Sequence, residues 1–284
     1  MTGWKHPAPE SWAEIVWAAL DEDLGPGDLS AACLDPDSTV DWHIEAQASG
    51  VICGAGIIGG LFAPEGDDPD NSVVEVLMGD GEPCDSGDIV ARGKTLSTKL
   101  LARERTGLNF LMLLSGVATL TRNFVERLEG LDVQICDTRK TVPGLRGLQK
   151  YAVRCGGGKN HRMGLFDGVM VKDNHIAAAG SIREAIERAR HRVGHMTKIE
   201  VECEHIDQVR EAVANGADIV LLDNMDPFSM SDVAREFRDK VILEASGGVN
   251  IDTVRGVASS GVHVISVGAL THSAPSLAFH LEVL

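Results

Sequence analysis

The second half of the chain repeats one pattern: a short apolar run, a polar turn, and then a stretch with the spacing of an amphipathic helix. The apolar runs occupy residues 133–136, 168–171, 199–201, 219–222, 241–243 and 262–267. Helical spacing separates the last four of them, over 206–214, 229–237 and 251–259. Such repeats indicate parallel strands joined by right-handed crossovers. Without a dinucleotide-binding fingerprint, the pattern favours a βα barrel over a doubly wound sheet, although the spacing alone allows both.

The first half of the chain has a different texture. Residues 10–24 have the spacing of a short amphipathic helix. Between residues 40 and 96, short alternating runs are separated by turn clusters, which predicts a small and largely antiparallel sheet. A long helical stretch follows over 97–128, and Gly107 and Gly116 within it allow a bend or the close approach of another helix.

Composition limits the classes of partner. The formal net charge of −16 argues against binding to nucleic acid or to an anionic membrane, because both need a basic surface. The N-terminus has no apolar signal core, and no run of about 18 apolar residues occurs. The six cysteines have no metal-binding spacing and are expected to be reduced, so we predict a soluble cytoplasmic protein.

Charged or glycine-rich signatures follow all six apolar runs. In chain order they are Asp137–Lys140, Lys172–His175, Glu202, Asp223–Asn224, Glu244 with Ser246–Gly248, and Gly268. In a βα barrel the carboxyl ends of the strands meet on one face, where the active site lies. A single polar strand end usually only contacts solvent, but six in succession predict one shared pocket.

The predicted pocket divides by charge. Its cationic side chains are Arg139, Lys140, His161, Arg162 and Lys172, which suit carboxylate or phosphate groups. Glu202 and Asp223 balance part of this charge, and they are candidates to hold Mg²⁺ or to stabilise positive charge on a sugar. A purely structural network of ion pairs is the alternative interpretation.

Two glycine turns follow the last two apolar runs. They are Ser246-Gly247-Gly248 and Val267-Gly268-Ala269, and each precedes a helix-like stretch. Late loops of βα barrels often bind phosphate through backbone N–H groups and a helix N-terminus. The two turns together therefore predict a phosphate site.

These motifs closely resemble the quinolinate phosphoribosyltransferase family. The resemblance is carried by DTRKTVPGLRGLQKYAVRCGGGKNHRMGLFDGVMVKDNH at 137–175, and by LDEDLGPGDLS, ERTGLNFLMLLSGVAT, IEVEC, LLDN, EASGGV and VGALTHS elsewhere. It covers essentially the whole chain. Cys155, where Thr is common, and Ala245, where Ser is frequent, depart from the pattern without touching charge recognition.

The resemblance implies an α/β fold in which an N-terminal open α/β sandwich precedes an incomplete βα barrel of the seven-stranded type. The corresponding boundaries are 1–112 for the sandwich, 113–270 for the barrel and 271–284 for a C-terminal segment that returns to the first domain. The implied reaction joins quinolinate to phosphoribosyl pyrophosphate and yields nicotinate mononucleotide, pyrophosphate and CO₂ in NAD synthesis. The resemblance also implies a magnesium-dependent homodimer, in which Arg105 of one subunit completes the site of the other.

Site residues carry over one by one. Those implied to surround the quinolinate carboxylates are Arg105, Arg139, His161, Arg162 and Lys172, with Thr138 beside them. Lys140 is placed near pyrophosphate, and Glu202 and Asp223 near the ribose and metal. The residues implied for the 5′-phosphate are Ser246, Gly247, Gly248, Val267, Gly268, Ala269 and His272. Catalytic roles fall to Lys140, Lys172, Glu202 and Asp223.

Two alternatives stay open at this point. A related phosphoribosyltransferase for another ring acid, like the molybdenum-operon paralogues, would share most motifs, although the Lys172–His175 and Arg105 motifs favour quinolinate. A catalytically silent barrel that senses a phosphorylated metabolite is the second. Glu202 and Asp223 argue against it, because carboxylates weaken the binding of anions.

Overall fold

The computed structural model describes residues 12–63 and 72–284, and the chain forms two compact units. Unit 1 comprises 1–122, 142–157 and 274–284, and unit 2 comprises 123–141 and 158–273. The division does not fall at the predicted boundaries of 112 and 270. Residues 142–157, expected in the barrel, group with unit 1 instead. The start of the predicted first helix at residue 10 lies outside the described residues.

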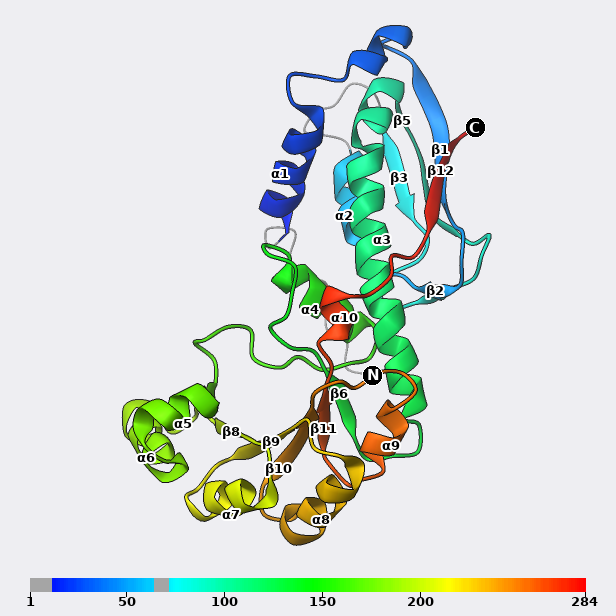
Figure 1. The fold of residues 1–284 in the computed structure, drawn as a ribbon. Coiled ribbons are helices and arrows are strands. Elements are labelled where there is room, and N and C mark those ends of the chain that lie inside the picture. The colour runs from blue at the N-terminus through cyan, green and yellow to red at the C-terminus, as the bar shows by residue number, and fades with distance from the viewer. Residues whose placement is uncertain (1–11, 64–71) are drawn as a thin grey trace. The chain divides into compact units, whose positions relative to one another are not determined.

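Unit 1 is built on an antiparallel sheet with the strand order β12-β1-β5-β3 (Figure 1). Its strands are β1 (Thr39–Ala46), β3 (Val73–Val76), β5 (Ile89–Leu96) and β12 (Phe279–Val283). The C-terminal strand pairs with β1, with Trp42 opposite Val283 and Ile44 opposite Leu281. The remaining elements of this part are α1 (Ala13–Leu24), η2 (Leu29–Cys33), β2 (Gly50–Val51), α2 (Ala55–Phe62) and β4 (Pro83–Cys84).

The core of unit 1 lies between this sheet and the helices α2 and α3. Trp42 and Ile44 of β1 are buried against Phe62 of α2 and Leu111 of α3. The predicted antiparallel sheet is thus present, and alternate residues of β1 face the core, as the period-two pattern requires.

Helix α3 (Ser97–Arg127) is one continuous helix, with neither glycine breaking it. It is the one helix in the described part of the chain that is long and apolar enough to cross a membrane, but 56% of its most apolar window is buried inside the protein. A side chain at position 116 would collide with the backbone of Pro275, and one at 107 would lie 3.2 Å from Ile58. The glycines therefore permit close packing, and α3 is a core helix.

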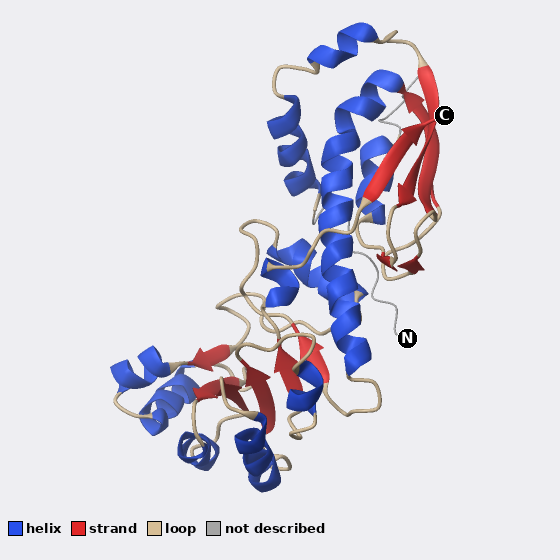
Figure 2. Cartoon of the chain, turned by 45° about the vertical axis from the view of Figure 1, so that its right-hand side comes forward, coloured by secondary structure: helices blue, strands red, loops and turns tan. Residues whose placement is uncertain are grey.

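Unit 2 is built on a parallel sheet, whose strands are among the red arrows in Figure 2. The order of its strands is β6-β11-β10-β9-β8-β7. Its strands are β6 (Gln134–Cys136), β7 (Val169–Val171), β8 (Ile199–Cys203), β9 (Ile219–Asp223), β10 (Ile242–Ser246) and β11 (Val264–Ser266). Lys159 forms a parallel bridge with Cys136 on the free side of β6. Neighbours thus follow chain order with one opening, between Lys159 and β7. This is the incomplete βα barrel that the family resemblance implied.

Helices lie on the outer side of the barrel strands (Figure 1). They are α5 (Asp173–Ala179), α6 (Ile182–Arg192), α7 (Ile206–Ala214), α8 (Pro227–Phe237) and α9 (Val254–Ala258), and the short helix α10 (Ala269–His272) follows the end of β11. Capping side chains define the first residues of two of these helices. Ser181 caps α6, and Asp226 caps α8 just before Pro227, a residue suited to the first helical turn.

Helix α4 (Arg146–Cys155) was not predicted from the sequence. It has a buried face that includes Leu148, Tyr151 and Ala152, and it belongs to unit 1. It ends at Gly156, where a side chain would collide with the Ala118 carbonyl of α3. The glycine run at 156–158 thus serves packing and a turn between the two units of the chain.

Candidate active site

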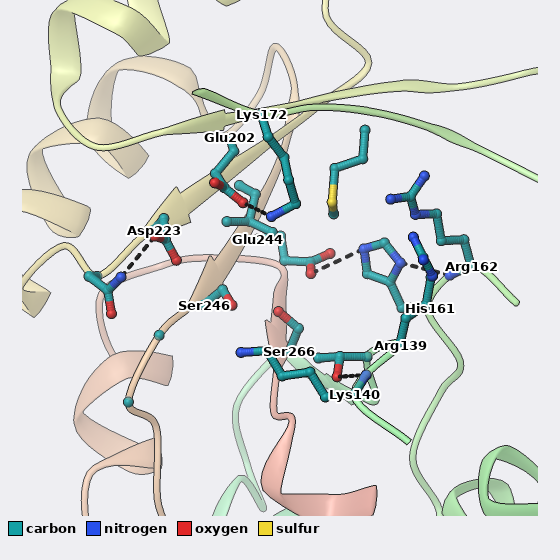
Figure 3. Close-up of a pocket in the computed structure, with 16 residues that line it drawn as sticks. Arg139, Lys140, His161, Arg162, Lys172, Glu202, Asp223, Glu244, Ser246 and Ser266 are labelled. Carbon is teal, nitrogen blue, oxygen red and sulfur yellow. Dashed lines mark hydrogen bonds and ion pairs between the residues drawn. The ribbon is translucent and has the colours of Figure 1, made fainter. Parts of the chain in front are cut away.

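A cavity of about 500 Å³ lies within unit 2 and is lined by residues from the carboxyl ends of the strands (Figure 3). Eleven predicted site residues line it: Thr138, Arg139, Lys140, His161, Arg162, Lys172, Glu202, Asp223, Ser246, Gly247 and Gly248. Five others complete the lining: Met170, Leu221, Asn224, Glu244 and Ser266. The barrel therefore brings the separate motifs into one pocket.

Lys172 and Glu202 form an ion pair across the neighbouring strands β7 and β8. Lys172 is held by the segment that follows it: its N–H donates to His175 Nδ1 over 3.0 Å, and its carbonyl accepts from the His175 N–H. Helix α5 begins directly after Lys172 for this reason. The Lys-Asp-Asn-His motif thus aims the ammonium group at the pocket.

His161 is fixed through its backbone by the buried Asp137 at the end of β6. One Asp137 oxygen accepts the His161 N–H over 2.9 Å, and the other accepts from Asn160 Nδ2 over 2.6 Å. Asp137 is completely buried, and the turn that carries His161 is consequently anchored to the strand beside it.

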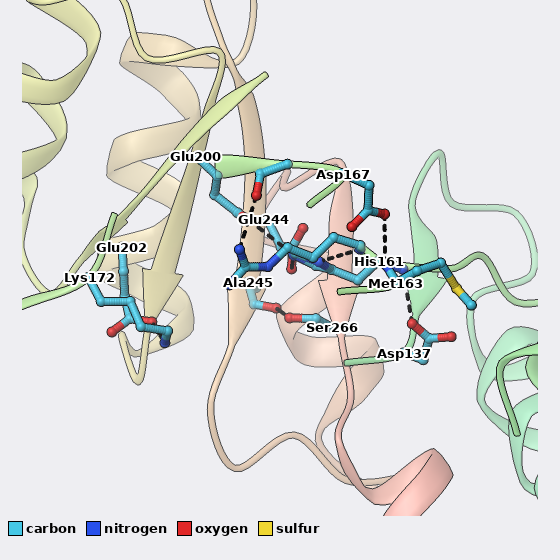
Figure 4. Close-up of polar contacts among 12 residues, drawn as sticks. Asp137, His161, Met163, Asp167, Lys172, Glu200, Glu202, Glu244, Ala245 and Ser266 are labelled. Atoms are coloured by element: carbon cyan, nitrogen blue, oxygen red, sulfur yellow. Dashed lines mark hydrogen bonds and ion pairs between the residues drawn. The ribbon is translucent and has the colours of Figure 1, made fainter. Parts of the chain in front are cut away.

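The His161 imidazole lies against two buried carboxylates, Glu200 and Glu244 (Figure 4). Its Nε2 is 3.1 Å from Glu200 and 3.5 Å from Glu244. Its Nδ1 accepts the Arg162 N–H over 2.7 Å, so the proton of the neutral ring is on Nε2 and points at the carboxylates. Burial and the neighbouring Glu200 raise the pKa of Glu244 to about 7.

Arg139 and Arg162 form the cationic wall of the cavity. Arg162 donates to the Gly168 carbonyl over 3.0 Å, which spans the opening of the barrel. Burial and the charge of Arg139 lower the pKa of Arg162. The like charges of the two guanidinium groups repel each other, and a bound anion would relieve this repulsion.

The turn after β10 depends on glycine. Gly247 has φ +98°, and a side chain there would collide with the Asn224 amide. Asn224 itself has φ +52°, donates its backbone N–H to the Ser246 carbonyl over 2.9 Å, and donates from Nδ2 to Asp223 over 2.8 Å. These hydrogen bonds hold the ends of β9 and β10 together and orient the Asp223 carboxylate.

The second glycine turn is placed differently from the first. Val267, Gly268, Ala269 and His272 do not line the cavity, although a side chain at 268 would lie 3.1 Å from Lys140 and 3.2 Å from His272. Thr271 also donates to the Lys140 carbonyl over 2.8 Å. The turn therefore borders the cavity through Lys140, and α10 begins directly after Gly268.

The expectation that both glycine turns lead straight into helices needs one correction. After Gly248 the chain makes further turns, and α9 begins only at Val254. The predicted helix began at 251. No helix N-terminus therefore stands at Gly247–Gly248, and only backbone N–H groups and the Ser246 side chain are available there.

Arg105 lies on α3 within unit 1. Its side chain is 60% exposed, and its nearest acidic partner is Glu104 at 3.9 Å. Arg105 does not line the cavity of unit 2. Its predicted role, which is to complete the site of a second subunit, stays a prediction.

Glu200 was missed in the sequence, and Glu244 was noted as a strand end but given no role. A signal for Glu200 was present, because alternate residues of a strand share one face. Glu202 was placed in the pocket, and Glu200 two positions earlier on β8 faces the same side, deeper in the barrel. Glu244 on β10 is likewise two positions before Ser246.

The pocket joins a cationic wall to a pair of carboxylates at the carboxyl end of an incomplete barrel. Glu202 and Asp223 lie on neighbouring strands and line the cavity, and a pair of carboxylates is a donor set that fits Mg²⁺. Fold and site together define a βα-barrel enzyme that acts on a multiply anionic substrate.

Comparison with known proteins specifies the class. The models of the quinolinate phosphoribosyl transferase N-terminal and C-terminal domains match residues 28–115 and 117–282. The chain belongs to the quinolinate phosphoribosyltransferase family. This confirms the resemblance predicted from the motifs and the assignment as a carboxylating nicotinate-nucleotide pyrophosphorylase.

Individual relatives agree along the whole chain. A protein of Bacillus subtilis named as a probable nicotinate-nucleotide pyrophosphorylase (carboxylating) is 44% identical over 92% of this chain and 90% of its own length. The crystal structure of nicotinate-nucleotide pyrophosphorylase from Ehrlichia chaffeensis is 38% identical, with a TM-score of 0.91 and coverage of 96% and 98%. NadC from Streptococcus pyogenes is 36% identical, with a TM-score of 0.91 and coverage of 99% of both chains.

Proposed function

We propose that the protein condenses quinolinate with phosphoribosyl pyrophosphate and releases pyrophosphate and CO₂, giving nicotinate mononucleotide for NAD synthesis. The observation that carries this proposal is the Lys172–Glu202 ion pair, which joins the cationic and the acidic parts of one cavity. A binding site for a dicarboxylate needs only the cations. The adjoining carboxylates suit a second substrate that develops positive charge.

The cationic wall is suited to the ring diacid. Arg139, Arg162 and Lys172 offer planar and point-charge donors to two carboxylates. Lys172 would exchange its contact with Glu202 for one with the substrate, leaving Glu202 free to face the sugar. His161, whose Nδ1 accepts the Arg162 N–H, contributes an anchored ring beside these cations.

The proposed reaction then proceeds in two bond changes. The quinolinate ring nitrogen attacks C1′ of the ribose as the C1′–O bond to pyrophosphate breaks, and the electron pair leaves with pyrophosphate. Glu202 and Asp223 would stabilise the positive charge that develops on the sugar. The bond between C2 and its carboxylate then breaks, CO₂ departs, and the electron pair left on C2 takes up a proton. The cationic wall would stabilise that electron pair.

Phosphate groups of the second substrate have matching donors. The turn Ser246–Gly248 presents backbone N–H groups and a hydroxyl to the cavity, which suits the 5′-phosphate. Lys140 lies at the border formed by Gly268 and Thr271, which suits the pyrophosphate end. Holding two anionic substrates side by side is itself a large part of the catalytic task.

Glu202 and Asp223 would also hold Mg²⁺ together with the pyrophosphate oxygens. Bound there, the ion would neutralise the charge of the leaving group. Binding of Mn²⁺ as a probe, measured by paramagnetic resonance with phosphoribosyl pyrophosphate present, should weaken in Glu202→Gln and in Asp223→Asn. Unchanged binding in both variants would reject these ligands.

We further propose a cytoplasmic homodimer in which Arg105 of each subunit reaches the cavity of the other. The exposed Arg105 side chain on α3 supports this arrangement. Six free cysteines are compatible with a reducing compartment.

Substrate binding tests the proposed function directly. In titration calorimetry, the protein should bind quinolinate at least about 10-fold more tightly than nicotinate, because the second carboxylate adds a charge-assisted contact. Arg139→Ala should abolish quinolinate binding. Equal affinity for the two acids, or near-normal binding by Arg139→Ala, would refute the proposal.

A further inference from the structure

Two cysteines of unit 1 bring their sulfur atoms together although they lie far apart in the sequence. Cys53 stands in the turn between β2 and α2, and Cys155 is the last residue of α4. Both sulfur atoms and an Asp80 oxygen lie within 4.8 Å of one another. None of the three residues lines the active-site cavity.

The two thiols differ in access. Cys53 is completely buried, whereas Cys155 is partly exposed. Burial, followed by the contact with Cys155, raises the pKa of Cys53 well above its ordinary value. An attack from solution therefore reaches Cys155 first, and Cys53 is placed to react only with what forms on Cys155.

Asp80 is already engaged, which argues against a metal centre at this cluster. One of its oxygens accepts the N–H groups of Gly54 and Ala55 at 2.9 Å each, at the start of α2. Its other oxygen accepts from the Tyr151 hydroxyl over 3.0 Å. The carboxylate thus has a structural task, and the reactive groups left are the two thiols.

We propose that Cys53 and Cys155 form a dithiol site that is oxidised reversibly to an intramolecular disulfide by small-molecule disulfides. The Cys155 thiolate attacks the small disulfide, a bond forms between the two sulfur atoms, and one thiol leaves. The Cys53 thiolate then attacks the Cys155 sulfur and releases the second thiol. Both protein thiols lose their protons to the departing thiolates, so two electrons pass from the protein to the small disulfide.

The geometry allows the bond with little movement. A disulfide needs sulfur atoms about 2.05 Å apart and Cβ atoms about 4 Å apart. The two sulfur atoms already lie within 4.8 Å of each other, and rotation of the two side chains brings them closer. The bond would tie the β2–α2 turn to the end of α4 and close a very long loop of chain, which stabilises the folded form.

Mass spectrometry of the full-length chain tests the proposal. Cys33 is exposed and would react independently, so the experiment uses the Cys33→Ser background, which keeps five thiols. After incubation with oxidised glutathione and alkylation, two of these five thiols should be lost. They should appear as one Cys53–Cys155 peptide pair without retained glutathione, and dithiothreitol should restore both. The melting temperature of the oxidised form should rise and return on reduction.

Two further variants separate the steps. Cys53→Ser should trap glutathione on Cys155, because the resolving thiol is missing. Cys203→Ser, which removes another buried thiol, should leave the Cys53–Cys155 pair unchanged. In the Cys33→Ser background itself, a stable glutathione adduct on Cys155, an unreactive Cys155, or a disulfide between any other pair would each overturn the proposal. This measurement needs no substrate, so it is independent of the proposed function.

Discussion

The Lys172 ammonium group and the Glu202 carboxylate form an ion pair between the ends of two neighbouring parallel strands. Lys172 belongs to the cationic part of the cavity and Glu202 to its acidic part. The two side chains contact each other before any substrate binds. When a substrate carboxylate pairs with Lys172, the ion pair with Glu202 breaks, and the Glu202 carboxylate is then free to face the sugar. Binding of one substrate thereby prepares the environment of the other.

Lys172→Met should lower kcat/KM for quinolinate by about 100-fold, because it removes a charge-assisted contact and leaves Glu202 without its cation. Steady-state kinetics would measure the loss as a raised KM for quinolinate together with a lower kcat. Lys240→Met, on the surface of unit 2, is the matched control and should change neither. A normal KM in Lys172→Met would remove this residue from the site.

Glu244 should make the folded protein less stable as the pH rises. Its folded pKa of about 7 lies above the ordinary value of 4.5, so the folded form keeps a proton that the unfolded chain has lost. The free energy of unfolding is lowered as a result. This loss is absent below pH 4.5, grows up to about pH 7, and reaches on the order of 3 kcal/mol.

Melting curves of wild type and Glu244→Gln between pH 5 and pH 8 test this linkage. The melting temperature of the wild type should fall relative to that of the variant as pH rises. Glu187→Gln, at an exposed position on α6, controls for the change of one carboxylate. Parallel curves for wild type and Glu244→Gln would show that the buried carboxylate is not protonated near neutrality.

Gly247→Ala should destabilise the protein and raise the KM for phosphoribosyl pyrophosphate. The added methyl group collides with Asn224, and the positive φ adds strain, at a total of about 1–3 kcal/mol. Gly256→Ala is the control, because that helical position has open space around it. The free energy of unfolding of this variant should rise by about 0.5–1 kcal/mol. Thermal unfolding and kinetics should therefore separate the two glycines, and equal behaviour would contradict the role given to the turn.

Arg105→Ala should inactivate the enzyme without unfolding it, since the side chain is exposed. If the arginine acts across a dimer, mixing inactive Arg105→Ala with inactive Arg139→Ala should restore about a quarter of the wild-type activity, because half of the dimers then contain one intact site. Mixing Arg139→Ala with His161→Ala should restore nothing, as both residues line the same cavity. Failure of the first pair would show that Arg105 does not complete the site of a second subunit.

The sequence predicted the parts of the site that lie at strand ends. The apolar runs located the strands, and Arg139, Lys172, Glu202 and Asp223 followed them, so convergence on one face placed these residues together. The periodicities predicted the antiparallel sheet and favoured a barrel, and the family resemblance implied that the barrel is incomplete.

What the sequence did not predict depends on tertiary contacts. Helix α4 was missed because it belongs to unit 1, whereas the segments before and after it in the sequence follow the barrel pattern of unit 2. Glu200 was overlooked because a charge inside an apolar run is only explained by its buried partner His161. The contact between Cys53 and Cys155 joins two segments that no local pattern relates.

The most direct test of the central claim is an assay of the product formed from each of two acids in separate reactions. Purified protein, Mg²⁺ and phosphoribosyl pyrophosphate are incubated with quinolinate carrying ¹³C in its 2-carboxylate, or with nicotinate, and nicotinate mononucleotide and ¹³CO₂ are quantified. The account predicts equal amounts of mononucleotide and ¹³CO₂ from quinolinate, and no mononucleotide from nicotinate. Mononucleotide formed from nicotinate but not from quinolinate would contradict it.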